Sequence, residues 1–295
     1  MPYLVLGGAQ IAVGAAAIFA RYALTGAGPL AVSASRLAIA AVLLLVFAAF
    51  MRSRPQHRPT RRENVILAAA GVALALHFAG WVWSLEYTTV AISTLLVATT
   101  PIWTALYDAL VRKRGLSPPA MAGFVGGGVG AIMVVGFDAA SPPISGHQWL
   151  GVALALLGSF AIGAYLLLVR EVRSALDTRA IVTRTYSWAA LALIFASAIA
   201  RQPPPAIGAT AAWGGILAMA LISQLLGHTA INASLRWFTP SAISFAALLE
   251  PVFAAALALA LFHEALPPLA LIGGLILLTS IAFVLREERL GDWAI

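Results

Sequence analysis

The residues best suited to bind a ligand are polar side chains in the middle of long apolar stretches. Gln224, His228 and Asn232 recur at intervals of four within residues 211–235, so a helix would place all three on one face. Inside a membrane a polar group is costly unless it has a partner or faces a water-filled cavity. The three side chains therefore either line a binding cavity or join neighbouring helices by hydrogen bonds, and the pattern leaves both roles open.

An imidazole and an indole occur together in an earlier apolar stretch, residues 65–86. His77 and Trp81 share a helical face there, and such a pair suits a flat, partly apolar ligand. Trp83 points about 160° away from Trp81 at about 100° per residue, so we expect Trp81 to be the inward side chain. Packing without a ligand is the alternative for His77. Three further candidate substrate-binding residues are Thr100, Trp103 and Ser244.

Glu250 and Arg36 are charged residues well inside apolar stretches. Glu250 directly precedes Pro251, and its carboxyl group could bind a substrate ammonium, carry a proton or anchor a kinked helix. Arg36 lies about two turns inside its stretch, and its long side chain could extend outward to the interface or pair with Glu86.

The composition indicates that these residues are held in a lipid bilayer. The 295 residues are 61% hydrophobic and only 10% charged, which is too little polar surface for a water-soluble protein of this size. The net charge of +7 is divided among short loops, so it predicts membrane topology and no nucleic-acid partner. The sequence has no cysteine, which excludes disulfides and cysteine-ligated metals, and we expect no cofactor or metal.

About 20 apolar residues are needed to cross a bilayer, and proline, glycine and charged residues divide the chain into ten such lengths. We expect an all-α integral membrane protein with spans near 3–23, 30–51, 65–86, 90–111, 119–137, 147–169, 180–200, 211–235, 241–262 and 268–285. Arginine and lysine gather in every second loop, beginning with the loop after the second span. Because basic loops stay in the cytoplasm, both termini should be cytoplasmic.

The two halves of the chain are similar at a constant offset. Residues 79–130 align with 229–280 without a gap, and the charges at aligned loop positions invert. A five-span unit repeated once must lie upside down in its second copy, so we predict two inverted five-helix repeats, residues 1–140 and 141–295. Pro101 and Pro251 occupy equivalent positions in spans four and nine, where each should kink its helix and act as a hinge or gate.

Several segments together resemble a known family. They are Pro29 with Arg36, residues 85–102 (LEYTTVAISTLLVATTPI) and residues 235–252 (LRWFTPSAISFAALLEPV). The chain resembles the ten-span EamA-type members of the drug/metabolite transporter superfamily, and among these the YddG aromatic amino-acid exporters. The resemblance implies alternating access, export from the cytoplasm, and a cavity lined by spans one, three, four, six, eight and nine. Since the Leu-Glu-Pro element occurs in members with different substrates, it favours a structural role for Glu250.

We therefore expect a transporter that exports aromatic and other neutral hydrophobic amino acids across a bacterial-type inner membrane. Export of drugs or other small metabolites is the first alternative, and an intramembrane enzyme or a scaffold is the second. His263 and Glu264 begin a zinc-protease pattern, but position 267 is proline, so we predict no enzymatic activity. The expected partners are a small-molecule substrate and the lipid bilayer, with the chain as a monomer or a homodimer.

Overall fold

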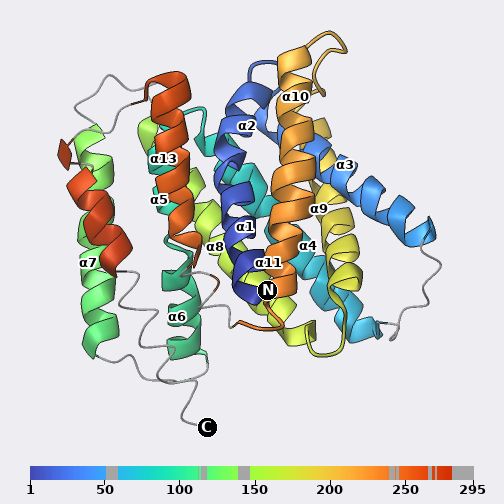
Figure 1. Ribbon diagram of the computed structural model, residues 1–295, viewed down its shortest axis with the longest axis horizontal. Coiled ribbons are helices and arrows are strands. Elements are labelled where there is room, and N and C mark those ends of the chain that lie inside the picture. The colour runs from blue at the N-terminus through green and yellow to red at the C-terminus, as the bar shows by residue number, and fades with distance from the viewer. Residues whose placement is uncertain are drawn as a thin grey trace.

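The computed structural model describes residues 1–50, 59–111, 113, 118–138, 147–238, 243, 246–264, 268–269 and 271–280. Within these ranges the chain is helical and contains no β-strand, as predicted (Figure 1). A helix satisfies its own backbone hydrogen bonds, which is the requirement for crossing lipid. The fold therefore agrees with the membrane environment that the composition predicts.

The described residues of the first half form these helices: α1 (Pro2–Gly14), α2 (Ala16–Ala23), α3 (Pro29–Phe50), α4 (Arg61–Ser84), α5 (Val90–Val97), α6 (Thr100–Leu110) and α7 (Pro118–Asp138). The second half contributes α8 (Gln148–Val172), α9 (Thr178–Ile199), α10 (Thr210–Ala218), the π-helix η1 (Met219–His228), α11 (Thr229–Ser234) and α13 (Leu249–Phe262). A further apolar helix covers Leu271–Ser280.

In the described part of the chain, six helical runs are long and apolar enough to cross a membrane, and they match the predicted spans to within a few residues: Pro2–Ala23, Pro29–Phe50, Arg61–Ser84, Gln148–Val172, Thr178–Ile199 and Thr210–Ser234. Four shorter apolar helices fall within the remaining predicted spans: Val90–Thr104, Met121–Met133, Leu249–Phe262 and Leu271–Ser280. The total of ten crossings stays a prediction.

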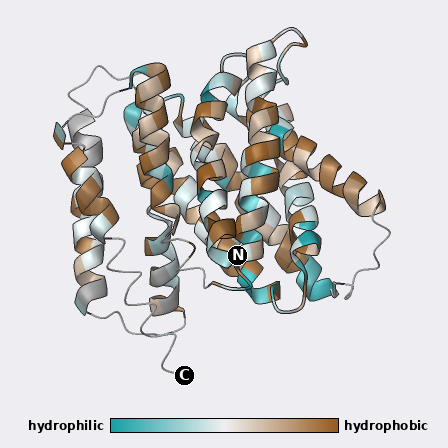
Figure 2. Ribbon diagram, in the orientation of Figure 1, coloured by the Kyte–Doolittle hydropathy of each residue, from teal (hydrophilic) through white to brown (hydrophobic). Residues whose placement is uncertain are grey.

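The outer surface of the bundle is apolar. Figure 2 shows hydrophobic residues along the lengths of the helices. Large side chains such as Phe195, Leu226 and Leu275 are 69%, 65% and 66% exposed. A water-soluble protein would leave few such groups uncovered, whereas lipid tails solvate them at no cost.

The two halves of the chain interlock where α4 lies against α8. Glycines permit this approach: a Cβ atom on Gly80 would lie only 2.7 Å from the carbonyl oxygen of Leu154, and one on Gly158 would lie 3.2 Å from the carbonyl oxygen of His77. Small residues at helix contacts are the usual means of close packing in membranes. This contact fixes the α4 face that carries His77 and Trp81 against the second half of the chain.

Candidate functional site

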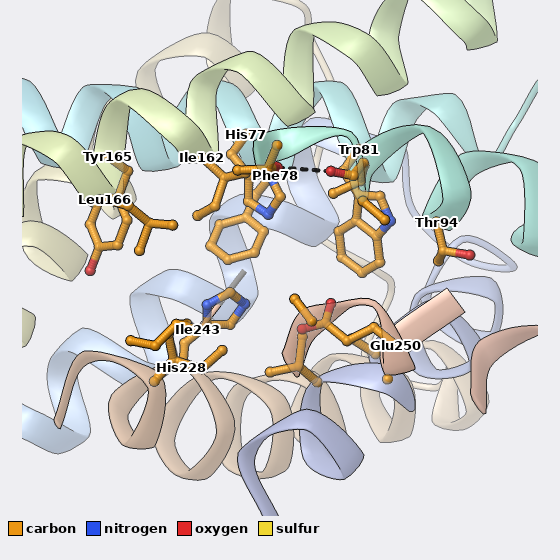
Figure 3. Close-up of a pocket in the computed structure, with 18 of the residues that line it drawn as sticks. His77, Phe78, Trp81, Thr94, Ile162, Tyr165, Leu166, His228, Ile243 and Glu250 are labelled. Atoms are coloured by element: carbon orange, nitrogen blue, oxygen red, sulfur yellow. Dashed lines mark hydrogen bonds between the residues drawn. The ribbon is translucent and has the colours of Figure 1, made fainter. Parts of the chain in front are cut away.

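A cavity lies between the two halves of the chain (Figure 3). Its walls come from α1, α2, α4, α5, α6, α8, η1, α11 and α13, which fall within the predicted spans one, three, four, six, eight and nine. These are the spans that the family resemblance implies. The residues that line it include Gly14, His77, Phe78, Trp81, Thr94, Ala98, Thr100, Pro101, Tyr165, His228 and Glu250.

One wall of the cavity is built from aromatic and imidazole rings. His77 and Trp81 lie parallel, with ring centroids 6.3 Å apart and an interplanar angle of 6°. Phe78 meets His228 edge to face at 5.3 Å. His77 Nδ1 lies 2.9 Å from the carbonyl oxygen of Gly158, and because a carbonyl can only accept, Nδ1 carries a proton; in the neutral ring Nε2 is then an acceptor. The wall can therefore contact a flat apolar group and also accept a hydrogen bond.

Glu250 brings a carboxylate to the cavity. Its side chain comes from the first turn of α13, and Figure 3 shows it across the cavity from Trp81. It is the acidic residue among those that line the cavity. Its side chain makes no hydrogen bond or ion pair with the described residues.

The predicted stripe on span eight is buried, and its three members take different partners. Gln224 accepts a hydrogen bond from Arg36, Asn232 accepts one from the Tyr165 hydroxyl at 2.9 Å, and His228 lines the cavity. Residues 219–228 form a π-helix, a form that often marks functional sites. One stripe thus serves both as helix-to-helix contact and as cavity wall.

Arg36 lies where neither predicted arrangement put it. Its side chain is fully buried, with Nη2 donating to Gln224 Oε1 at 2.7 Å and the guanidinium carbon 4.0 Å from the centre of the Phe78 ring. The predictions that it extends to the interface or pairs with Glu86 are wrong. The side chain does not extend outward, because Gln224 from the second half of the chain offers a hydrogen-bond acceptor and Phe78 offers an aromatic face inside the bundle.

The predicted residues on span four divide between the cavity and a neighbouring helix. Thr100 lines the cavity. Trp103 is absent from the lining, and its Nε1 donates to the Ser159 hydroxyl of α8 at 3.0 Å. Ser244, the candidate on span nine, lies outside the described residues.

Spans four and nine are both interrupted next to their prolines. The first break falls at Ala98 and Thr99, before Pro101, and the second at Leu248, before Pro251. Ala98 and Leu248 are 150 positions apart, which is the offset of the internal repeat. The prolines thus coincide with broken helices, and each break ends at the cavity, where Pro101 and Glu250 line it.

Hydroxyl groups satisfy the backbone at the first break. Proline has no N–H, so the carbonyl of Val97 loses its helical donor, and the Thr100 hydroxyl donates to it at 2.8 Å. The Thr99 hydroxyl donates to the carbonyl of Leu96 at 2.6 Å and lies 2.9 Å from the Ser159 hydroxyl. The break is therefore a stable part of the fold that α8 helps to hold.

An ion pair joins three elements at the end of the bundle where α2 and α13 finish. Arg21 Nη2 donates to Glu264 Oε1 at 2.8 Å and also lies 3.2 Å from the carbonyl oxygen of Thr88. The other carboxylate oxygen accepts from the backbone N–H of Val90, at the start of α5, at 2.9 Å. We call these contacts the latch. Glu264 does not belong to a zinc-protease site, but it joins the two halves of the chain beside the cavity.

We expect Glu264→Gln to open this end of the cavity to water-soluble reagents, because it removes the ion pair. Thr94 lines the cavity one turn after Val90. Since the chain has no cysteine, Thr94→Cys gives a single thiol whose reaction with a membrane-impermeant reagent can be timed. Losing roughly 1 kcal/mol of latch strength should raise the labelling rate about fivefold.

Glu86→Gln is the matched control for the latch. Glu86 is half-buried and follows α4 at the same end of the bundle, but it does not line the cavity. Its substitution should leave Thr94→Cys labelling unchanged. Equal labelling rates with and without the Glu264→Gln substitution would show that the latch does not close the cavity.

Several residues of the site carry no signal in the sequence. Phe78, Tyr165 and Ser159 contact the predicted residues directly, yet each is typical of ordinary packing in an apolar helix. Gln10 on α1 is fully buried, and neither atom of its amide group has a partner among the described residues. Gln10 lies one turn before Gly14, which lines the cavity. A polar residue inside an apolar span is the sequence signal that could have identified it.

Comparison with known proteins agrees with this arrangement. The model of the EamA-like transporter family matches residues 1–136 and 149–286. Among curated proteins none matches the chain. A solved structure described as "Crystal structure of protein" has a TM-score of 0.69 at 15% sequence identity and covers 98% of both chains. At that identity the likeness shows the fold alone, and no subtype of exporter is named by these comparisons.

Proposed function

This chain belongs to the EamA-like transporter family, and on that premise we propose that it exports aromatic and other neutral hydrophobic amino acids by alternating access. Membership makes it a multi-pass membrane transporter of small molecules with two repeats. Our proposal adds the substrate, the inverted relation of the repeats, the bacterial-type inner membrane and the cytoplasmic position of both termini.

The observation that carries the substrate proposal is the pairing of a ring-lined wall with a carboxylate. The rings of His77, Phe78 and Trp81 offer flat surfaces for an aromatic side chain. Glu250 stands across the cavity as an acceptor for the substrate ammonium. We assign His228 and Thr100, which line the cavity, to direct contact as well, and give Trp103 and Asn232, which lie outside the lining and bond to other side chains, positioning roles.

Aromatic contacts between the first span and the second half of the chain, at the two ends of that span, support alternating access. At the end where α2 and α13 finish, Tyr22 lies 5.6 Å from Phe262 between ring centroids, next to the latch. At the end where α1 begins, Tyr3 meets Phe238 edge to face at 5.3 Å. Each pair joins the first span to the second half of the chain. Breaking one pair while keeping the other would open the cavity to one side only.

Counterflow in proteoliposomes tests the proposal. Vesicles loaded with unlabelled phenylalanine should take up labelled phenylalanine and tryptophan well above the rate for threonine or lysine. Trp81→Ala should abolish the exchange because it removes a cavity ring, whereas Trp83→Ala, at a half-buried residue outside the lining, should retain it. Preference for lysine would overturn the aromatic substrate, and no exchange above the lipid background would overturn transport of amino acids.

A second candidate substrate is an aromatic organic cation. The Glu250 carboxyl group has no hydrogen-bond or ion-pair partner among the described residues and faces an indole ring, an arrangement that also suits a cation over a π-system. Tetraphenylphosphonium serves as the probe in the same vesicles. Its exchange in the absence of phenylalanine exchange would favour drug export over amino-acid export.

A further inference from the structure

Arg36 is a buried charge with no counter-ion among the described residues. Its side chain has no exposed surface, and no acidic group contacts it among the residues the structure describes. A guanidinium carries five N–H donors, of which one, on Nη2, reaches an acceptor, Gln224 Oε1 at 2.7 Å. Nε and Nη1 have no partner within the described part of the chain. Burying such a charge is costly unless a ligand binds the remaining N–H donors.

The unused donors of Gln224 add to those of Arg36. The Gln224 carbonyl oxygen is occupied by Arg36, and its Nε2 is buried with no partner among the described residues. The two side chains therefore present N–H groups and no acceptor. A carboxylate, with two oxygens that only accept, is the chemical group that such a set of donors fits.

One aromatic ring separates this pair from the cavity. The guanidinium carbon lies 4.0 Å from the centre of the Phe78 ring and 6.0 Å from that of Trp81, and both rings line the cavity. His228, on the same π-helix as Gln224, meets Phe78 at 5.3 Å. A ligand against these rings thus lies within a few ångströms of unused donors.

We propose that Arg36 and Gln224 form a subsite for the carboxylate of the substrate, which reaches them when the Phe78 ring turns aside. The inference rests on the proposed function, because it presumes that the cavity takes an amino acid. It explains why α3, which contributes no residue to the cavity lining, sends a charged side chain toward it.

Two indole compounds test the subsite in counterflow. Tryptamine is tryptophan without the carboxylate. In the wild type, tryptophan should exchange at least about tenfold faster than tryptamine, and Arg36→Met should erase that difference while tryptamine exchange stays within about twofold. Equal exchange of both compounds by the wild type would overturn the subsite and leave the proposed function standing. Failure of tryptophan and phenylalanine to exchange at all would overturn both.

Gln224→Glu keeps the proposal testable if Arg36→Met does not fold. The new carboxylate would pair with Arg36 inside the protein and occupy the subsite, so we expect a higher melting temperature together with loss of the preference for tryptophan. If Arg36 only supported the fold, the variant would keep that preference, and this result would overturn the subsite. Gln202→Glu makes the same chemical change away from the cavity and keeps the acceptor for the Leu30 N–H, so it should change neither measurement.

Discussion

Glu250→Gln should lower counterflow of phenylalanine and tryptophan about ten- to hundredfold. The substitution keeps the shape of the side chain and removes the ionisable carboxyl group that lines the cavity. A hydrogen bond to a charged group contributes about 1.5–3 kcal/mol, which corresponds to about ten- to hundredfold in affinity. An aromatic substrate that lacks the ammonium group, such as indole-3-propionate, should be affected far less.

Measuring both counterflow and uptake driven by a pH gradient distinguishes the possible roles of Glu250. If its carboxylate binds the ammonium, both counterflow and uptake driven by a pH gradient are lost together. If it carries a proton, Glu250→Gln keeps counterflow and loses only the response to the gradient. Glu86→Gln, outside the cavity, should behave as the wild type in both modes. Wild-type activity of Glu250→Gln in both assays would assign Glu250 to the anchoring of α13 alone.

The spans are the part of the fold that the sequence predicts best, because hydrocarbon thickness requires a fixed length of apolar helix. Only some of the breaks in the helices can be predicted from the sequence. Pro101 marks one in advance, since it lacks an N–H, whereas the break at Ala15 and the π-helix at 219–228 occur without proline. Where Gly14 ends α1, its α-carbon lies close to α13: an added Cβ would be 3.2 Å from that of Phe253. Such a contact between distant segments leaves no local pattern.

In the site, too, local helical spacing determines some side-chain positions and contacts between distant segments determine others. His77 and Trp81 were predictable as one face of α4, since helical spacing alone sets their relation. The position of Arg36 was not, because its partner Gln224 is 188 residues away and the general tendency of arginine to reach the interface pointed elsewhere. Trp103 likewise turns to Ser159, across a contact between the halves that no sequence periodicity encodes.

Pro101→Ala and Pro251→Ala should slow exchange about tenfold or more while leaving substrate binding nearly unchanged. Proline in a helix interior costs about 3 kcal/mol, so alanine would favour a continuous helix across either break and shift the balance between two conformations by up to about a hundredfold. The breaks lie at equivalent positions of the two repeats, and Pro101 and Glu250 belong to the cavity wall there. Binding and exchange should be measured on the same purified protein, the first by quenching of tryptophan fluorescence and the second by counterflow.

We expect the effect of the two prolines to be similar in size, because equivalent breaks would open opposite ends of one cavity under the proposed inverted arrangement of the repeats. Pro203→Ala is the control: Pro203 is exposed in the segment between α9 and α10 and breaks no span, so its substitution should leave exchange intact. Normal exchange by both cavity variants, at normal expression, would show that the breaks are static features of the wall. Slow exchange with only one of them would mean that a single half-helix moves, and that the other repeat serves as a fixed frame.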